Sequence, residues 1–392
     1  MTAIAKGHSA ADRTRQVGVE AVAKHVDSVD REARFPTEAF AALKQAKLLG
    51  IMVPKELGGE GASISEVSEV CHTLGQFCSS TAMIYAMHQI QVACFVRHGL
   101  DSAWHRGFLQ QVAGEQLLIA SATSEAGISG DVRSSSCAVE LVGERFTLKK
   151  NATVISYGAN ADAILVTARR TPDSPPSDQV IALVLKADYR LEQTGGWDTL
   201  GMRGTCSNGY WLHASGLAAQ ILPLPYADIS AQTMLPTSHL TWSSLWLGIA
   251  TDAVSRARAF IRAEARKKPG STPPGAVRLA EVVSMLQQMK GNVVAAAKQY
   301  EESMGQPEKL TSLSFAISMN SLKTATSQMA VQVVNHTLLI CGIFGYKNDT
   351  KFSLGRHLRD VHSSVVMVSN DRIFGNTANL LLVHKEDTGL FT

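Results

Sequence analysis

The segment RHLRD at residues 356–360, followed by MVSNDRI at residues 367–373, decides how the rest of the chain is interpreted. The eighth residue after Asp360 in this stretch is Val368. A valine side chain has no lone pair, so it cannot accept a proton and cannot act as a general base. Any proton acceptor that works with this segment must therefore come from another residue.

Long helices are predicted on the N-terminal side of this stretch, from about residue 227 onward. Apolar residues recur at helical spacing through residues 285–302 and 313–339. Many of the positions expected to be buried in these helices are alanine or valine. The last part of the chain is therefore predicted to be a helical bundle.

The region from residue 118 to about residue 222 has the pattern of a small sheet domain. Short β-branched runs at residues 163–167 and 180–185 predict buried strands, and residues 138–148 predict a hairpin around Gly143. The prolines of residues 171–178 exclude regular strand pairing, so this segment is predicted to be a surface loop.

The first third of the chain is predicted to be helical. One helix opens at residues 35–38, where Pro36 is tolerated in the first turn, and Gly50 is expected to end it. Residues 53–61 form a glycine-rich loop. Further helices are predicted at residues 65–77, 81–98 and 102–113. The predicted domains are residues 1–117, 118–226 and 227–392, in a mostly α protein with a small central β domain.

Several segments occur in an order that resembles the acyl-CoA dehydrogenase family over nearly the whole chain. They are LLGIMVPKELGG at 48–59, LGMRGTCS at 200–207, GIFGY at 342–346 and RHLRD at 356–360. The resemblance implies an N-terminal helical domain, a middle β-barrel-like domain and a C-terminal helical bundle. It also implies FAD as cofactor. In most of the family a glutamate at the position of Val368 removes the α-proton of an acyl thioester.

The segment SEAGISGD at residues 124–131 resembles the family loop that lies against the flavin. Glycines such as Gly130 let backbone N–H groups approach the isoalloxazine, and Ser121, Thr123 and Ser124 can donate hydrogen bonds to its polar edge. An ordinary connection from a strand to a turn is the alternative, which the position of the loop in the fold disfavours.

A second flavin segment departs from the family pattern. The usual Trp-Ile-Thr corresponds here to VIS at residues 154–156. Ser156 keeps a hydroxyl for the flavin, whereas Val154 lacks the aromatic face that packs on the ring in relatives. The resemblance therefore implies FAD binding with one stacking contact weakened.

The resemblance also implies that a neighbouring subunit completes the FAD site. The family stretch Arg-x-x-Phe-Gly corresponds to RKKPG at residues 266–270, where Arg266 can bind pyrophosphate. A solvated basic loop explains these residues equally well. Asn370 and Arg372 align with family positions that reach FAD. These residues imply a homodimer or homotetramer.

The identity of the base is open. Some relatives carry their glutamate on an earlier helix, and counting back ten residues from Gly248 gives Ser238, beside His239. His239 can titrate near neutrality and accept a proton. It also falls where relatives have an arginine that binds CoA. Asp371, three residues after Val368, is expected at a helix N-terminus instead.

Composition excludes several other classes of protein. The net charge is +3 and the longest basic run is residues 266–268, which disfavours nucleic-acid binding. No signal peptide and no membrane-spanning run is evident, so a cytoplasmic location and no membrane partner are expected. The six cysteines and twelve histidines form no metal or disulfide pattern.

Three functions agree with these residues. The leading one is an FAD-dependent oxidoreductase that dehydrogenates an acyl-CoA or other acyl thioester, with hydride passing to flavin N5. Its electron acceptor is a protein or oxygen. The second keeps the flavin and performs monooxygenation or β-elimination from a thioester, such as desulfination. The third is a non-catalytic FAD-binding subunit. Anaerobic flavin reduction by acyl-CoA separates them.

Overall fold

The computed structural model describes residues 9–128 and 131–385, and the chain divides into two compact units. The first unit contains Met1–Val67, Met83–Thr199 and Arg203–Ser238. The second contains Ser68–Ala82, Leu200–Met202 and His239–Thr392. The three-domain division at residues 117 and 226 stays a prediction, although the strands do lie between Ile119 and Leu217.

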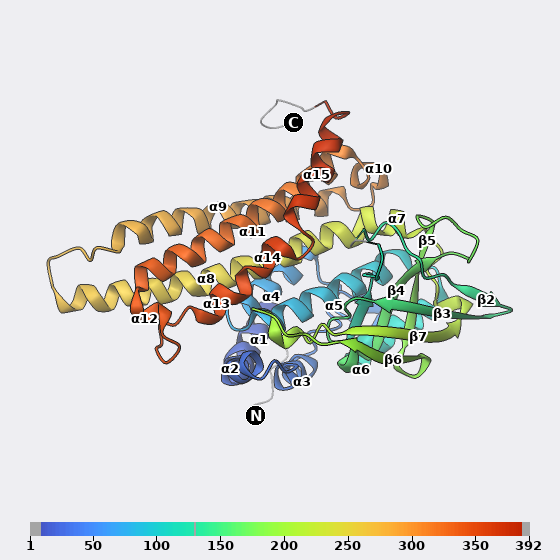
Figure 1. Cartoon of the computed structure of the whole chain (residues 1–392), viewed down its shortest axis with the longest axis horizontal. Coiled ribbons are helices and arrows are strands. Elements are labelled where there is room, and N and C mark those ends of the chain that lie inside the picture. Colours follow the sequence, from blue (N-terminus) through green and yellow to red (C-terminus); the bar gives the residue numbers. More distant parts are fainter. Residues whose placement is uncertain (1–8, 129–130, 386–392) are drawn as a thin grey trace. The chain divides into compact units, whose positions relative to one another are not determined.

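The N-terminal part is helical, as predicted (Figure 1). Its helices are α1 (Ala10–Val17), α2 (Ala23–Arg31), α3 (Thr37–Gln45), α4 (Ile64–Gly75), α5 (Ser79–His98) and α6 (Ala103–Glu115). A π-helical turn at Gly18–Val22 joins α1 to α2, and a 3₁₀ turn at Lys55–Leu57 lies in the predicted glycine-rich loop.

The prediction that Gly50 ends α3 was wrong. The helix ends at Gln45, and Lys47 adopts the left-handed conformation, with φ of 57°. Gly50 serves close packing instead, because a Cβ there would lie 2.7 Å from the Cα of Ala113 on α6. Gly50 is thus a site of close packing between two chain segments and is not the C-cap of the preceding helix.

The first unit contains two sheets. The three-stranded sheet has the order β1 (Ile119–Ala122), β4 (Ala163–Arg169), β5 (Gln179–Leu185), with β1 parallel to β4 and β4 antiparallel to β5. The four-stranded antiparallel sheet has the order β2 (Glu140–Val142), β3 (Arg145–Ala152), β7 (Gly209–Leu217), β6 (Tyr189–Gly195).

The predicted strands and hairpin are confirmed. Strands β4 and β5 are buried along nearly their whole length, which is why their sequences are continuous apolar runs. Strand β3 alternates between exposed and buried residues, and one of its buried positions is Lys150. Gly143 forms the β2–β3 turn with φ of 59°, a conformation that favours glycine.

The C-terminal part is a helical bundle. Its long helices are α8 (Leu235–Lys267), α9 (Ala276–Ser303) and α11 (Leu313–Cys341), of which α9 and α11 pack side by side (Figure 1). Shorter helices are α7 (Tyr226–Ile229), α10 (Pro307–Leu310), α12 (Ile343–Tyr346), α13 (Gly355–Val361), α14 (Ser363–Val366) and α15 (Asn370–Leu381). Among the described helices none is both long and apolar enough to cross a bilayer.

Two of the sequence segments that carried the family resemblance meet inside the second unit. The backbone N–H of Met202 donates to Oδ1 of Asp360 at 2.7 Å. A Cβ on Gly201 would lie 2.3 Å from the backbone oxygen of Arg359, so this position requires glycine. The LGM and RD sequences therefore form one contact, although they are about 160 residues apart in the chain.

Candidate functional site

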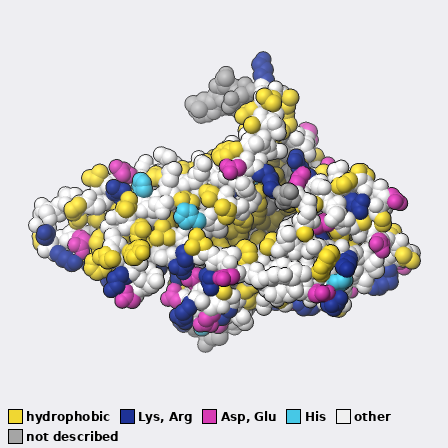
Figure 2. All heavy atoms as spheres, viewed as in Figure 1, with side chains coloured by type: hydrophobic (Ala, Val, Ile, Leu, Met, Phe, Trp, Pro, Cys, Tyr) yellow, Lys and Arg dark blue, Asp and Glu magenta, His cyan; other side chains and the backbone are white. Residues whose placement is uncertain are grey.

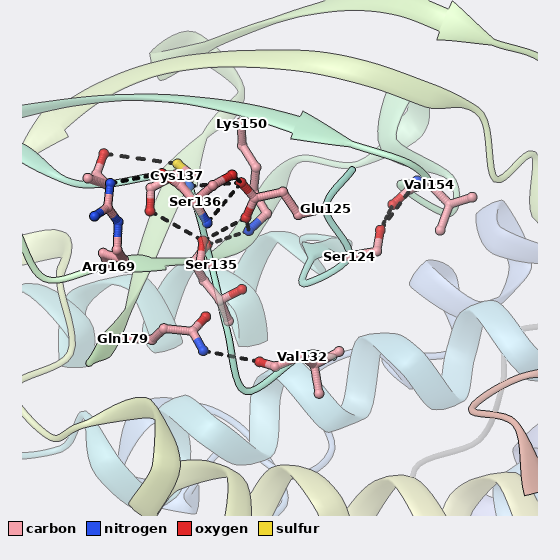
Figure 3. Close-up of polar contacts among 12 residues, drawn as sticks. Ser124, Glu125, Val132, Ser135, Ser136, Cys137, Lys150, Val154, Arg169 and Gln179 are labelled. Atoms are coloured by element: carbon pink, nitrogen blue, oxygen red, sulfur yellow. Dashed lines mark hydrogen bonds and ion pairs between the residues drawn. The ribbon is translucent and has the colours of Figure 1, made fainter. Parts of the chain in front are cut away.

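Strand β1 leads into a row of hydroxyl side chains. Ser121 lies in the strand, and Thr123 and Ser124 follow its end. Ser121 and Thr123 are half-buried, and no described residue hydrogen-bonds to either side chain. Ser124 differs, because its hydroxyl donates to the backbone oxygen of Val154 at 2.9 Å and accepts from the Val154 N–H at 3.3 Å (Figure 3). The hydroxyl hydrogen of Ser124 is thus already used within the protein.

The hydroxyl of Ser156 begins a short hydrogen-bonded chain. Its Oγ lies 2.7 Å from Oγ of Ser207, which lies 2.8 Å from Oγ1 of Thr205. Ser207 and Thr205 are buried and Ser156 is half-buried. Each hydroxyl can donate one proton and accept others, so this chain controls the direction in which Ser156 presents its proton.

The loop that follows β1 contains a buried carboxylate. Glu125 pairs with Lys150, with Oε2 and Nζ 3.1 Å apart and both side chains almost fully buried. Burial alone would raise the pKa of Glu125, but the charge of Lys150 and the hydroxyl donors of Ser135 and Ser136 outweigh it and lower that pKa. Glu125 is therefore ionised and enclosed, which is unsuitable for a general base.

Two other predicted flavin contacts belong to this part of the chain. Gly130 lies outside the described residues. Gly127 has φ of 88°, so the loop does require a glycine at that point. Val154 is 36% exposed, and its role in flavin binding stays a prediction.

In the second unit, Val368 lies on a turn fixed by a buried lysine. Val368 has φ of 46° and its side chain is 44% exposed. Lys323, from α11, donates to the backbone oxygens of Val368 at 2.8 Å and Ser364 at 2.9 Å, and to Oδ1 of Asn370 at 2.6 Å. Burial lowers the pKa of Lys323 to about 8. The turn therefore contains a buried cation held by neutral oxygen atoms.

The remaining predicted residues of this unit have different environments. The amide of Asn370 bonds to Lys323 and also to Ser327, at 3.0 Å from Nδ2, so it is engaged within the protein. Arg266 is exposed in the last turn of α8. Arg372 and Asp371 are exposed in the first turn of α15, which confirms the helix N-terminus expected for Asp371.

His239, on α8, is buried with one ring nitrogen engaged. Its Nδ1 lies 2.9 Å from the backbone oxygen of Met319, and because a carbonyl oxygen can only accept, Nδ1 carries the proton. Burial lowers the pKa of His239 to about 4, so the ring is neutral at physiological pH. No described residue bonds to Nε2, which leaves its lone pair available.

Sequence reasoning missed the two buried lysines. Lys150 occupies a position of β3 that alternation assigns to the core, and that signal was present in the sequence. Lys323 lies in a helix whose other buried residues are mostly apolar or small. All six cysteines are free thiols, and five of them are buried. Within the described residues no three His, Cys, Asp or Glu side chains are grouped to hold a metal ion.

Comparison with protein families matches most of the chain. Residues 7–115 match the acyl-CoA dehydrogenase N-terminal domain, and residues 230–367 match the acyl-CoA dehydrogenase C-terminal domain. The chain belongs to the acyl-CoA dehydrogenase family. Members of this family are flavin-dependent oxidoreductases that act on CH–CH groups, and they oligomerise. The predicted family and fold class are confirmed, and so is the prediction of an acyl-CoA dehydrogenase-like flavoenzyme.

Individual relatives are distant but extend over nearly the full length. A protein of Mycobacterium leprae named probable acyl-CoA dehydrogenase fadE25 is 24% identical over 365 residues, covering 92% of this chain and 90% of that protein. Among solved structures, FMN-bound TdsC of Paenibacillus sp. A11-2, a dibenzothiophene monooxygenase, has a TM-score of 0.84 at 20% identity, covering 98% of this chain and 100% of that one.

The fold is also that of a dehydrogenase structure. Butyryl-CoA dehydrogenase of Megasphaera elsdenii has a TM-score of 0.78 at 17% identity, and the match covers 95% of this chain and 97% of that one. The same fold therefore carries both a dehydrogenase and a monooxygenase at similar structural distance from this chain.

Proposed function

We propose that this protein is a flavin-dependent monooxygenase, which uses a reduced flavin and dioxygen and does not need a carboxylate base. One observation carries the proposal: neither position at which the family places its catalytic glutamate has a carboxylate. One position is Val368, and the other is occupied by Ser238 beside His239. The same-fold structure of a dibenzothiophene monooxygenase supports it by showing that this architecture accommodates such chemistry.

The residues of the first unit fit a flavin. Ser121 and Thr123 present hydroxyls with no described protein partner, and Ser156 presents a hydroxyl ordered by Ser207. These groups match the hydrogen-bonding atoms along the polar edge of an isoalloxazine. A bound flavin, when reduced, supplies the electrons that activate dioxygen. FAD is the cofactor that the family resemblance implies, and FMN is the alternative.

The choice between FAD and FMN depends on the adenylate half of the cofactor. The counterpart of the family pyrophosphate segment keeps Arg266 but has Pro269 in place of phenylalanine. Equilibrium titration of the apoprotein with each flavin decides the question. Preferential binding of FAD supports an intact shared site, whereas equal affinity for FMN means that the adenylate is not recognised.

Dehydrogenation of an acyl thioester is the second candidate, and His239 favours it. The bond from Nδ1 to Met319 fixes the tautomer, so Nε2 has a lone pair that can take a proton. Two facts rank this candidate lower. A base is most effective when its pKa lies near the working pH, and the pKa of His239 is about 4. In addition, the proton acceptor would be a neutral histidine, whereas the resemblance implies a glutamate in most of the family.

One pair of experiments separates these functions. Under anaerobic conditions, oxidised flavoprotein is mixed with a panel of acyl-CoAs and the flavin absorbance is followed. In parallel, flavin reduced by a separate reductase is supplied with isotopically labelled dioxygen and with indole or dibenzothiophene, the compounds named with the TdsC structures. Labelled product without anaerobic bleaching supports the monooxygenase.

The other outcomes are equally informative. Fast bleaching by an acyl-CoA overturns the monooxygenase and supports the dehydrogenase. Flavin binding with neither reaction supports a non-catalytic subunit. Failure to bind any flavin overturns all three.

A further inference from the structure

We infer that Glu125 and Lys150 are positioning residues that shape the flavin-contacting loop before any flavin binds. This inference rests on the proposed flavin site. Thr123 lies two residues before Glu125 in the chain, so the position of Glu125 restricts the backbone that carries the Thr123 hydroxyl. The pair takes no part in the reaction itself.

The carboxylate of Glu125 joins the two limbs of the loop. From the returning limb it accepts hydrogen bonds from the N–H of Cys137 at 2.8 Å, the N–H of Ser136 at 3.2 Å and the hydroxyl of Ser135 at 2.6 Å (Figure 3). The Ser136 hydroxyl donates to it as well. With Lys150, five donors surround the two oxygen atoms, which have about four lone-pair sites, so the carboxylate is fully used within the protein.

Lys150 connects this carboxylate to both sheets of the unit. Its backbone belongs to β3 in the four-stranded sheet, and its Nζ donates to the backbone oxygen of Thr167 on β4 in the three-stranded sheet at 2.7 Å. The same Nζ donates to Oε2 of Glu125 at 3.1 Å. The side chain is 0% exposed. The buried ammonium group of Lys150 thus links the loop to both sheets.

The returning limb has anchors of its own. The N–H of Ser135 donates to the backbone oxygen of Pro176 at 3.0 Å, Nη2 of Arg169 donates to that of Ser136 at 3.1 Å, and Nε2 of Gln179 donates to that of Val132 at 3.2 Å. These anchors bind the limb to the β4–β5 edge and do not involve Glu125.

In the outgoing limb two residues have anchors that are independent of the ion pair, compared with the three residues named in the returning limb. Besides Glu125, it is held by the Ser124 hydroxyl on Val154 and by the N–H of Ala126 on the backbone oxygen of Asn151, at 2.9 Å. Loss of the Glu125 carboxylate therefore loosens the limb that carries the predicted flavin contacts, while the returning limb stays in place.

The Glu125–Lys150 ion pair holds this loop in a single conformation. An apolar pair of similar volume could fill the space between the sheets, but it would not orient the N–H groups of Ser136 and Cys137 or the hydroxyls around them. A preformed loop lowers the entropy cost of binding, so the pair increases flavin affinity without touching the flavin.

The test compares three variants with the wild type. Glu125→Asp keeps the charge but shortens its reach. The double variant Glu125→Leu with Lys150→Met removes both charges together, so that neither is left buried and unpaired. The control is Arg170→Met with Asp178→Leu, which removes a part-exposed ion pair of the same unit, with 3.2 Å between its charged atoms and no contact to Glu125.

Two quantities are measured for each protein: the flavin dissociation constant, by quenching of flavin fluorescence, and amide hydrogen exchange at residues 124–128 and 135–137 of the apoprotein. In both Glu125 variants we expect faster exchange at 124–128 and a dissociation constant raised about tenfold or more, as expected for lost preorganisation. The control should stay within about twofold of wild type, because part-exposed pairs contribute little.

The outcomes distinguish this inference from the proposed function. Wild-type exchange and wild-type flavin affinity in a folded Glu125 variant would overturn the positioning role while leaving the flavin site intact. If the wild type binds no flavin, the proposed function fails, and hydrogen exchange still decides whether the pair shapes the loop. If the double variant does not fold, the Glu125→Asp measurements decide, because this variant leaves Lys150 paired in charge.

Discussion

The ammonium group of Lys323 donates a hydrogen bond of 2.8 Å to the backbone oxygen of Val368. A buried cation therefore fixes the backbone at Val368, the position at which the family resemblance implies a catalytic glutamate in relatives. Oxygen atoms of Ser364 and Asn370 complete its environment, and the ring of Trp246 lies 5.5 Å from Nζ. The turn at Val368 lacks a carboxylate, but its backbone is still held in one conformation by the hydrogen bonds from Lys323.

Replacing Lys323 with methionine should destabilise the second unit. The substitution leaves the backbone oxygens of Ser364 and Val368 without the Lys323 donor, and each such loss costs about 1–3 kcal/mol; Oδ1 of Asn370 keeps the Ser327 hydroxyl at 3.3 Å. We expect a decrease in the free energy of unfolding of at least about 2 kcal/mol, measured by urea denaturation. Lys290→Met, at an exposed position of α9, is the control and should change little. Equal stability of the two variants would contradict the account of Lys323.

Installing a carboxylate by Val368→Glu tests whether only the base is missing. Wild-type protein should be reduced slowly or not at all by straight-chain acyl-CoAs. General-base catalysis contributes about 10²–10⁴-fold, so the variant should bleach the flavin faster by up to that factor if the thioester is admitted. The half-exposed position and the nearby cation should keep the new carboxylate ionised.

The measurement is anaerobic stopped-flow absorbance with both proteins. Val368→Gln is the matched control, because it has the same shape without a titrating group. Rapid reduction of the wild type would show that another base acts, and His239→Ala would then be the next variant to measure.

The stability of the protein should depend on pH through His239. Burial lowers its pKa to about 4, whereas the unfolded chain keeps a value near 6.5. The unfolded state therefore binds one more proton between these pH values. The stabilisation is complete above pH 6.5 and is lost as pH falls toward 4, by about 1.4 kcal/mol per pH unit. His239→Asn, which keeps a donor for Met319, should flatten this dependence by that amount.

The pH dependence is read from denaturant unfolding at several pH values between 4.5 and 7. Other buried histidines contribute to the wild-type slope, so the difference between the two proteins is the relevant quantity. Identical slopes would mean that folding does not lower the pKa of His239.

The hydroxyl chain at Ser156 should influence a bound flavin through Ser207. Removing the Ser207 hydroxyl deletes the 2.7 Å bond that directs Ser156. A neutral hydrogen bond contributes about 0.5–1.5 kcal/mol, which for a two-electron couple corresponds to a shift in flavin midpoint potential of about 10–30 mV. Spectroelectrochemistry of Ser207→Ala measures it, with Ser255→Ala on α8 as control. An unchanged potential would mean that the Ser156 hydroxyl does not hydrogen-bond to the flavin.

The protein should not exist as a stable monomer at micromolar concentration. Apolar residues are exposed where α11 ends and in α12, including Leu339, Ile343 and Tyr346, each more than 60% exposed. The space-filling view shows hydrophobic side chains on this face of the protein (Figure 2). Exposed apolar clusters of this kind mark interfaces between proteins. Sedimentation should show a dimer or tetramer, and Ile343→Asp should shift it toward monomer with weaker flavin binding. A flavin-loaded monomer would contradict a site shared through Arg266.

Sequence patterns were sufficient to predict several elements of the fold. Helices α9 and α11 were found because their apolar residues recur at helical spacing, whereas strands β4 and β5 were found because each is a short, continuous β-branched apolar run. The end of α3 was misplaced because Gly50 was interpreted by its local conformational freedom, whereas contact with α6 requires it. Local patterns do not encode which distant segment a glycine will meet.

The polar centres were harder to predict for a related reason. Glu125 and Lys150 are 25 residues apart on different elements, and Lys323 and Val368 are 45 apart. Their partners are largely backbone atoms, which every residue possesses, so no residue type marks the partner in the sequence. The predicted hydroxyls at Ser121, Thr123 and Ser156 lie at or near strand ends as expected, but their availability depends on neighbours such as Ser207 that only the structure identifies.

The bond between Met202 and Asp360 has a consequence for the order in which the chain can fold during synthesis. Every segment of the first unit has been made once residue 238 leaves the ribosome. The second unit needs residues 200–202 together with Asp360, so its central contact must wait for more than 120 further residues. Domains generally fold as units during synthesis, N-terminal first. The second unit is therefore the last to form, and a nascent chain halted before residue 360 would hold a finished sheet region beside an incomplete bundle.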